Sequence, residues 1–250
     1  MTVHPAGIEP CPKCGFPRQD FAAPSCARCG LIFARYDRAR LRRDAAAVSP
    51  PAVAGGALLL GAKPLPLPEL LAKGLLLGLL AVVGGRLALA GFAGNAAGEH
   101  WLHLINLPFH EFGHLLFRPL GRFLATLGGS LTQLLVPLLC LGVLLGHRRD
   151  PFGASVAGWW LGENLLDIAP YIADARRLSL PLLGGNTGQT APYGFHDWDY
   201  LLTETGLLRA DQTLARLAHG LGALLMVGAL AWGGLVLWRG QRLLARKEKV

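Results

Sequence analysis

Long uncharged apolar runs constrain this chain more than any other feature of its sequence. Residues 123–146 and 220–238 contain no charged side chain, and residues 70–94 contain only Lys73 and Arg86. A helix needs about 20 apolar residues to cross the hydrocarbon core of a bilayer, and each run is close to that length. Only 16% of the residues are charged, whereas a soluble domain has about a quarter. The sequence therefore predicts a membrane protein and argues against a soluble enzyme.

Two further apolar stretches, at about 100–118 and 152–175, contain His, Glu, Asn and Asp. Ionisable groups at membrane depth are costly, so such residues usually belong to a functional site. Together the five stretches predict an all-α polytopic membrane protein with about five transmembrane helices, over residues 69–250. The side of the C-terminus stays open, because five crossings place the basic tail 239–249 outside, against the positive-inside rule.

The first 32 residues form a separate unit with its own metal chemistry. Two Cys-x-x-Cys pairs, each followed by glycine, are eleven residues apart, and their cysteines are Cys11, Cys14, Cys26 and Cys29. Four thiolates in this spacing are typical of a closed tetrahedral site for a structural zinc ion. Residues 1–32 are therefore predicted to be a zinc ribbon, and we expect it to dock a protein rather than nucleic acid.

Residues 33–68 are expected to be a basic tether and a linker. Residues 34–43 contain five arginines, and residues 44–68 are rich in Ala, Pro and Gly. The net charge of +8 is clustered at the two ends and in short loops, which favours membrane orientation over a nucleic-acid-binding face. Residues 1–30 lack the pattern of a signal peptide. We therefore expect a multi-pass protein of the cell (inner) membrane, in contact with lipid, with its N-terminus in the cytoplasm.

The segment His110-Glu111-Phe112-Gly113-His114 is the most informative motif of the chain. Residues four apart share one face of a helix, so both imidazoles can bind one zinc ion. Glu111 can then act as general base toward a zinc-activated water and pass the proton to the leaving amine. Catalytic zinc sites have three protein ligands and one open position, so the motif requires a third ligand from elsewhere.

Residues 152–175 are expected to supply that ligand. This stretch contains Glu163, Asp167 and Asp174, which lie within roughly 40° of one another on a helix that turns about 100° per residue. Asp167 is deepest in the apolar stretch and is the first choice, with Asp174 and Glu163 as alternatives.

Three other histidines have possible roles near the motif. His103 shares a helix face with the motif, and together with His100 it can line a path for water or protons, although capping the helix start is the simpler interpretation. His196 lies in the segment Phe195-His196-Asp197-Trp198-Asp199-Tyr200. That segment can form an additional metal-contacting element, but a surface loop is the expected account.

The motif and the acidic stretch resemble the site-2 protease family of intramembrane zinc metallopeptidases. That family has a core of three helices, with HExxH on the first and an Asp ligand, preceded by Leu, on the third. The resemblance covers about residues 100–177 and matches Leu166-Asp167 to the third helix. It implies that Asn164 lies near the metal and helps to bind the substrate carbonyl. It also implies that the helix with Gly128-Gly129-Ser130 is the second core helix.

The predicted function is an intramembrane zinc endopeptidase that cleaves a membrane or membrane-adjacent protein, with Glu111 as general base. It would contain one catalytic and one structural zinc ion. The alternative is a non-proteolytic membrane protein, either a metal transporter or a zinc-ribbon scaffold, because buried His and carboxylate residues also suit a metal pathway. A transporter more often has inverted repeats, and the sequence has no internal repeat.

Overall fold

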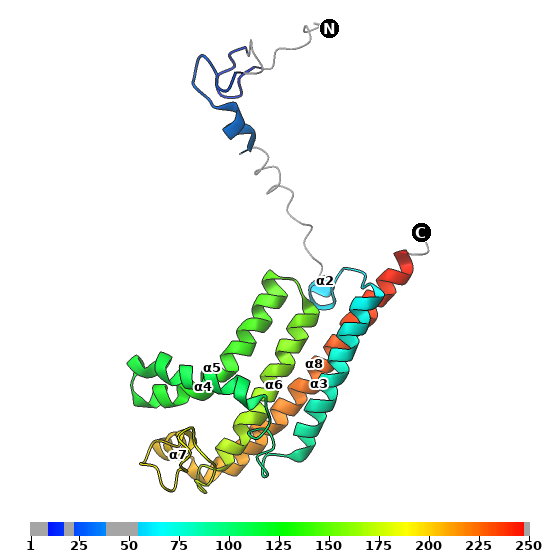
Figure 1. Cartoon of the computed structure of the whole chain (residues 1–250). Coiled ribbons are helices and arrows are strands. Elements are labelled where there is room, and N and C mark those ends of the chain that lie inside the picture. The colour runs from blue at the N-terminus through cyan, green and yellow to red at the C-terminus, as the bar shows by residue number, and fades with distance from the viewer. Residues whose placement is uncertain (1–9, 18–22, 39–54, 248–250) are drawn as a thin grey trace. The chain divides into compact units, whose positions relative to one another are not determined.

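The structure, a computed structural model, describes residues 10–17, 23–38 and 55–247. The chain divides into two compact units, Met1–Val53 and Ala54–Val250 (Figure 1). The described part of the first unit is built around four cysteines, and the second unit is helical. The second unit thus begins inside the stretch that was expected to be linker.

Two knuckles form the described part of the first unit. An antiparallel bridge closes each knuckle, pairing Pro10 with Pro17 and Ser25 with Ile32. Gly15 and Gly30 both have a φ of 70°, a conformation that glycine adopts without steric cost. A helix follows over residues 33–38, and Phe33 packs against Cys11 and Cys26. The chain therefore turns tightly at the glycine that follows the second cysteine of each pair.

The second unit is all-helical in its described residues except for one isolated bridge in a loop. Its α-helices are α2 (Gly55–Leu60), α3 (Leu67–Ala90), α4 (His103–Phe117), α5 (Arg122–Gly142), α6 (Pro151–Ala173), α7 (Asp197–Glu204) and α8 (Asp211–Lys247). Short turns η1 (Arg118–Leu120), η2 (Val143–His147) and η3 (Leu208–Ala210) connect or extend them. Helix α2 forms within residues 44–68, the expected linker, while residues 39–54 lie outside the described part.

Proline, aspartate and glycine mark the limits of these helices. Helix α6 starts at Pro151, whose fixed φ suits the first helical position. The Asp150 carboxylate accepts a hydrogen bond from the Gly153 N–H at 3.0 Å and caps the same end. Helix α3 ends before Gly91, which has a φ of 70°. These local signals set where the chain reverses direction.

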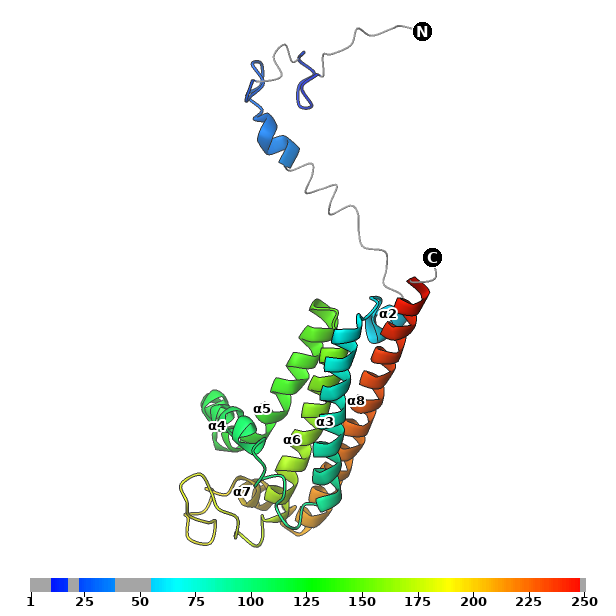
Figure 2. The same ribbon diagram turned by 45° about the vertical axis from the view of Figure 1, so that its right-hand side comes forward.

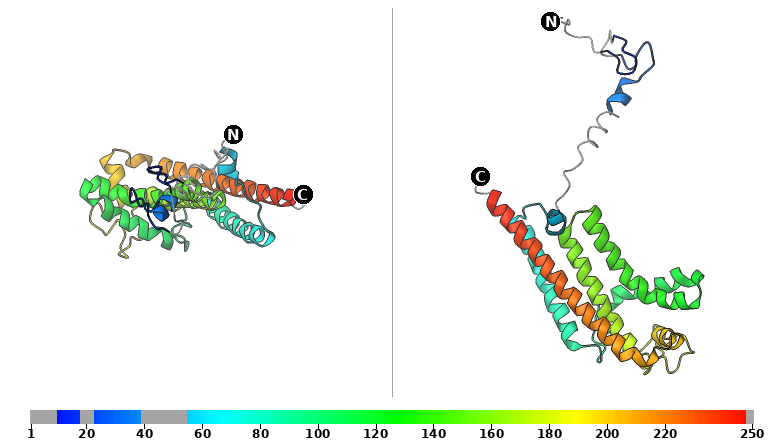
Figure 3. Two further views of the ribbon diagram at one scale, coloured as in Figure 1. Left: turned by 90° about the horizontal axis from the view of Figure 1, so that it is seen from above. Right: turned by 180° about the vertical axis from the view of Figure 1, so that it is seen from behind.

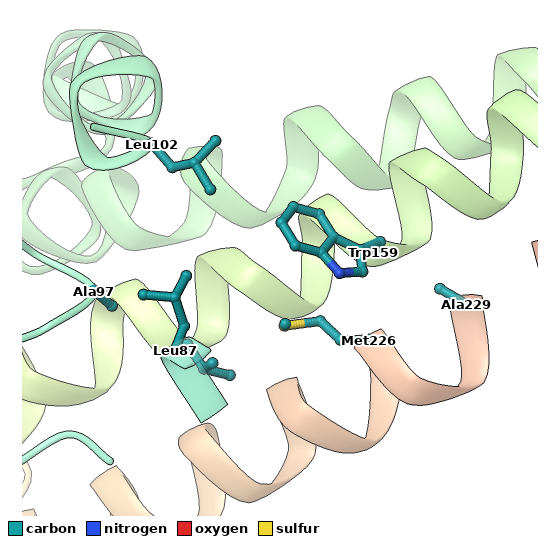
Figure 4. Close-up of a cluster of buried hydrophobic side chains, with 7 residues drawn as sticks. Leu87, Ala97, Leu102, Trp159, Met226 and Ala229 are labelled. Carbon is teal, nitrogen blue, oxygen red and sulfur yellow. The ribbon is translucent and has the colours of Figure 1, made fainter. Parts of the chain in front are cut away.

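Helix α6 is the central helix of the second unit. It packs along α8 and also contacts α3 and α5, while α3 packs against α8 (Figures 1 and 2). Gly162 and Gly222 let α6 and α8 approach closely, because a Cβ on Gly162 would lie 2.6 Å from the carbonyl oxygen of Gly222. An apolar cluster that includes Leu87, Trp159 and Met226 joins α3, α6 and α8 (Figure 4).

Helix α4 and the first turns of α5 lie side by side and project from this bundle, next to the loop that contains α7 (Figure 3). The two helices touch backbone to backbone. A Cβ on Gly128 would lie 2.6 Å from the carbonyl oxygen of Gly113, and a Cβ on Gly113 would overlap the carbonyl oxygen of Gly128. Because the glycine inside the HExxH motif has no side chain, the motif can pack directly against the backbone of α5.

Within the described residues, three helices are long and apolar enough to cross a membrane: Leu67–Ala90, Arg122–His147 and Leu208–Lys247. They correspond to three of the five expected spans, and the molecule is accordingly best described as a helical membrane protein. The expected span 100–118 contains α4, whose 15 residues extend only about 22 Å at 1.5 Å per residue. The expected span 152–175 contains α6, which is long enough but places its polar residues inside the bundle. Five spans are therefore not supported.

Candidate metal centre

The HExxH motif forms one compact group of ligand atoms, as the spacing predicted. One ligand atom from each of His110, Glu111 and His114 lies within 4.8 Å of the others. The ring centroids of the two histidines are 4.8 Å apart. The motif lies on α4, where residues four apart share a face. This group could hold a metal ion.

Hydrogen bonds orient both imidazole rings. His114 Nδ1 lies 2.9 Å from the carbonyl oxygen of Ala125, an acceptor, so Nδ1 is assigned the proton. His110 Nδ1 lies 3.1 Å from Gln133 Oε1, which is also an acceptor, because the amide nitrogen of Gln133 donates to Asp167. With Nδ1 directed at an acceptor, Nε2 is the ring nitrogen available to a metal. Acceptors of this kind behind the ring are the usual way in which proteins orient histidine ligands.

Space for an ion lies next to the rings because residue 129 is glycine. A Cβ at Gly129 would lie 2.6 Å from His110 Nε2 and 2.7 Å from His114 Nε2. Any other side chain at this position would occupy the space in front of both ligand nitrogens. The sequence predicted Gly129 only as part of a second core helix. In the structure this helix, α5, forms one wall of the site.

The carboxylate that meets the two imidazoles comes from Asp197, at the start of α7. Its Oδ2 atom lies 2.9 Å from His110 Nε2 and 3.3 Å from His114 Nε2. Zinc bonds of about 2.0–2.1 Å in a tetrahedral site would separate neighbouring ligand atoms by about 3.3 Å. Oδ2 is within hydrogen-bonding distance of His110 Nε2 and lies close enough to both nitrogens to serve as a third ligand for an ion bound by the two imidazoles. Only 7% of Asp197 is exposed.

Asp197 is ionised in this environment. Burial alone would raise the pKa of its carboxyl, but hydrogen bonds and positive charge from His110 and His114 outweigh this effect and hold the pKa below its ordinary value. A carboxylate is the form that ligates a metal. The loop segment that contains Asp197 was expected at the surface, and this expectation is wrong for both Asp197 and His196, which is 2% exposed.

Neighbouring residues hold Asp197 in place. Its backbone N–H donates to the Tyr171 hydroxyl at 3.0 Å. His196 caps α7, since its Nδ1 accepts from the Asp199 N–H at 3.1 Å. Because Nδ1 is the acceptor, the neutral ring has its proton on Nε2, 3.3 Å from Asp174 Oδ2. Asp174 also accepts hydrogen bonds from the loop that follows α6.

The residues expected to supply the third ligand have other partners in the structure. Asp174 serves the loop and His196, and it does not pair with His110 or His114. Asp167 does not pair with them either: its carboxylate lies 2.9 Å from His103 Nδ1 and accepts from Gln133 Nε2 at 2.8 Å. Helical periodicity correctly predicted that these acidic residues lie inside the bundle. It could not show that a carboxylate from a loop distant in sequence lies closer to the two imidazoles of the motif.

The remaining acidic residue, Glu163, is fully buried and joined to Asp167 by one amide. Asn106 Nδ2 lies 3.0 Å from both Glu163 Oε2 and Asp167 Oδ2. Asn106 was not predicted, although it lies one turn before the HExxH motif. Asn164 was predicted to lie near the metal. Its side-chain amide instead donates a hydrogen bond to the carbonyl oxygen of Trp160, and Asn164 does not line the cavity in front of the metal group.

A cavity of about 1060 Å³ opens in front of the metal group. Its wall contains His110, Glu111, His114 and Asp197, together with apolar side chains such as Leu107. His103 also lines it, as the less favoured of its two interpretations requires, whereas His100 packs against Trp101 and is not in the wall. The cavity is large enough to admit a short extended peptide.

The four cysteines of the first unit form a second metal-binding group. One ligand atom from each lies within 4.8 Å of the others. The Cys11–Cys29 and Cys14–Cys26 sulfur pairs are both 3.7 Å apart, and tetrahedral zinc with bonds of about 2.3 Å gives about 3.8 Å. All five cysteines of the chain are free of disulfides. The donor set and its dimensions fit a closed zinc site.

Comparison of the chain with protein-family models, with curated proteins and with solved structures finds no match. The resemblance to site-2 proteases therefore depends on the motif residues alone.

Proposed function

We propose that the second unit is a membrane-embedded zinc endopeptidase in which His110, His114 and Asp197 hold the metal and Glu111 is the general base. The observation that carries this proposal is the convergence of Asp197 Oδ2 on both Nε2 atoms, at 2.9 and 3.3 Å, beside Glu111. Two histidines and one carboxylate with an open side toward a cavity are the ligand set of many catalytic zinc sites.

A zinc ion held there would supply a Lewis acid that activates a water molecule and polarises the carbonyl of the scissile peptide bond. Glu111 accepts the proton of the attacking water, because its carboxylate lies in the cavity wall within the same group of ligand atoms. It then delivers that proton to the leaving amine. The hydrogen bonds behind His110 and His114 keep both rings aimed at the metal throughout.

The distribution of apolar side chains supports a location inside the bilayer. On α4, Leu104, Phe112 and Leu115 are 53–69% exposed and point away from the site, while His110 is buried. On α3, Leu75 is 78% exposed. Exposed apolar surface of this extent is typical of contact with lipid. We infer that α3, α5, α6 and α8 cross the membrane and that α4 enters it without crossing.

For the first unit we propose a structural zinc ion held by its four cysteines. The buried core of this unit consists of two of those cysteines and Phe33, so the ion would supply most of its stability. A closed site leaves no position for substrate. We therefore infer a docking module for a protein partner, of which the sequence identifies no further property.

The decisive experiment replaces Glu111 by Gln in the full chain. Loss of a general base lowers the rate by about 10²–10⁴-fold, while zinc content should stay unchanged because the two histidines and Asp197 remain. Purified protein in proteoliposomes would be tested on fluorogenic peptides that span the membrane once. Glu99→Gln is the matched control, since Glu99 also lines the cavity but lies outside the motif.

Equal cleavage by wild type and Glu111→Gln protein would refute the peptidase. So would zinc flux into dye-loaded vesicles without any peptide cleavage, because that result favours the transporter alternative. Cleavage that Glu111→Gln removes and Glu99→Gln preserves supports the proposal.

A further inference from the structure

The cavity in front of the metal group extends along one face of α4. Five residues of that helix line it and share this face: His103, Leu107, His110, Glu111 and His114. From His103 to His114 the face extends about 16 Å, at about 1.5 Å per residue. Leu180 and Leu182, in the loop after α6, line the same cavity. An extended peptide can therefore lie along α4, between the metal group at one end and His103 at the other.

His103 presents one ring nitrogen to this cavity. Its Nδ1 lies 2.9 and 3.1 Å from the two carboxylate oxygens of Asp167. Within the described residues its Nε2 has no hydrogen-bond partner. The His103 side chain is 35% exposed, whereas that of Asp167 is 1% exposed. Because Nδ1 is turned toward the buried carboxylate, the opposite edge of the ring, which carries Nε2, faces the cavity.

A buried network fixes the position of Asp167 and therefore of His103. The Asp167 carboxylate also accepts from Gln133 Nε2 at 2.8 Å and from Asn106 Nδ2 at 3.0 Å. Asn106 is held in turn, because its Oδ1 accepts from Trp160 Nε1 at 2.9 Å. Buried polar groups that are paired in this way rigidify one another. The His103 ring is therefore held in one orientation.

The same network favours the charged form of the ring. The hydrogen bond with Asp167 raises the pKa of His103 above its ordinary value, although burial opposes this effect. The two amides help to stabilise the Asp167 charge, so the imidazolium can donate a second hydrogen bond from Nε2. Such a donor binds a carboxylate more strongly than a neutral oxygen, because charge-assisted hydrogen bonds are about twice as strong as neutral ones.

His103 lies too far from the metal group to take part in the chemical step. Seven residues separate it from His110, which is about 10.5 Å along the helix. A general acid or base must lie within about 3 Å of the proton that it transfers, or be joined to it by one water. His103 is also outside the group of ligand atoms formed by the HExxH motif. Its position in the wall therefore indicates a role in binding.

We infer that His103 binds an acidic side chain of the substrate, about three residues from the scissile bond. An extended peptide advances about 3.3 Å per residue, so three residues cover the distance from His110 to His103. Leu107 lies between them in the cavity wall, so the intervening residues of the substrate are apolar. The distance to the scissile bond rests on the proposed peptidase function, whereas the binding itself can be measured without cleavage.

Peptide binding to the full chain with Glu111→Gln tests the inference. Glu, Gln, Met and Lys would each be scanned through a fluorescent apolar peptide, one position at a time, and wild-type protein would locate the scissile bond by mass spectrometry of the products. About three residues from that bond, Glu should bind about 10–100-fold more tightly than Met, with Gln between them. His103→Gln should remove this preference. His100→Gln, outside the cavity wall, is the matched control.

A reversal of charge separates binding from a merely structural role. His103→Glu should favour the Lys peptide over the Met peptide at the same position, a gain that damage to the fold would not produce. Should His103→Gln fail to accumulate in the membrane, His103→Lys keeps a cation beside Asp167 and should keep the preference for Glu. Asp167→Asn should weaken that preference, because the ring loses the charge that holds it.

Equal binding of the Glu and Met peptides at every position would overturn the inference. So would a preference for Glu that survives His103→Gln or disappears in Arg118→Gln, because Arg118 lines the cavity beyond His114. A preference for Lys in the unsubstituted cavity would overturn it as well, and would indicate binding by Glu99. Cleavage by the wild type without the Glu preference would refute the role of His103 alone. The Glu preference without any cleavage would refute the peptidase and leave the binding site.

Discussion

The two metal-binding groups of this protein are built in opposite ways. The four cysteines come from residues 11–29, and in the described part of their unit the buried core is small, consisting of Cys11, Cys26 and Phe33. The histidine group draws His110 and His114 from α4 and Asp197 from α7, with supporting residues from α5 and α6. In the first group the metal would hold the fold together, whereas in the second the fold holds the ligands. Removal of metal should therefore have different consequences for the two units.

The strongest contrast should appear when zinc is withdrawn from the cysteine group. Cys11→Ser should abolish the ordered structure of residues 10–17 and 23–38, because folding energy in such small units comes from the metal. Zinc content should fall by one ion per chain, and helicity of the second unit should persist. Hydrogen exchange and metal analysis measure both. Cys140→Ser is the matched control, and unchanged protection of residues 10–17 and 23–38 in Cys11→Ser would contradict the contrast.

Asp197→Asn should remove the zinc of the histidine group while leaving the helices folded. The variant keeps the shape of the side chain but loses the charge that completes the ligand set. Metal analysis after dialysis should show one ion fewer, and circular dichroism should not change. The control is Asp199→Asn, two residues along the same helix.

The same measurement on Asp167→Asn decides between the two assignments of the third ligand. The contacts of Asp167 with His103 and Gln133 predict that this variant keeps its zinc, with weaker affinity. Loss of the ion from Asp167→Asn, together with its retention in Asp197→Asn, would restore the sequence-based assignment.

Gly129→Ala should obstruct the histidine group from the side of α5. The added Cβ would lie 2.6 and 2.7 Å from the Nε2 atoms of the two histidines, so the rings must move. Overpacking of this kind costs about 1–3 kcal/mol, and we expect weaker zinc binding together with lower thermal stability. Gly142→Ala in the same helix has open space around it and serves as control. Normal zinc affinity in Gly129→Ala would show that the ion lies elsewhere.

Gln133→Leu should have a smaller effect than Gly129→Ala. It removes the acceptor behind His110 but none of the ligands, and such losses lower metal affinity by about 10–100-fold. Chelator competition measures this change. Gln241→Leu, on an exposed face of α8, should bind zinc as the wild type does. A Gln133→Leu affinity equal to that of the wild type would mean that the hydrogen bond does not orient the ring.

Features encoded by short spacings could be predicted from the sequence. The doubled Cys-x-x-Cys-Gly pattern specifies its own knuckles, because the turn and both thiolates lie within five residues. The HExxH spacing places His110 and His114 on one face of any helix. The apolar runs at 70–94, 123–146 and 220–238 correspond to the three long helices, since their length and composition suffice.

Tertiary structure was needed wherever the deciding partner is distant in sequence. Asp167 follows an apolar segment, whereas Asp197 lies in a polar, glycine-rich loop. Nothing local shows that Gln133 and His103 bind the first while the second reaches His110, 87 residues earlier. The crossing number was likewise undecided, because hydropathy does not show that α4 folds back on α5 through Gly113 and Gly128. Helical periodicity determines which residues share a face, whereas long-range packing determines what that face meets.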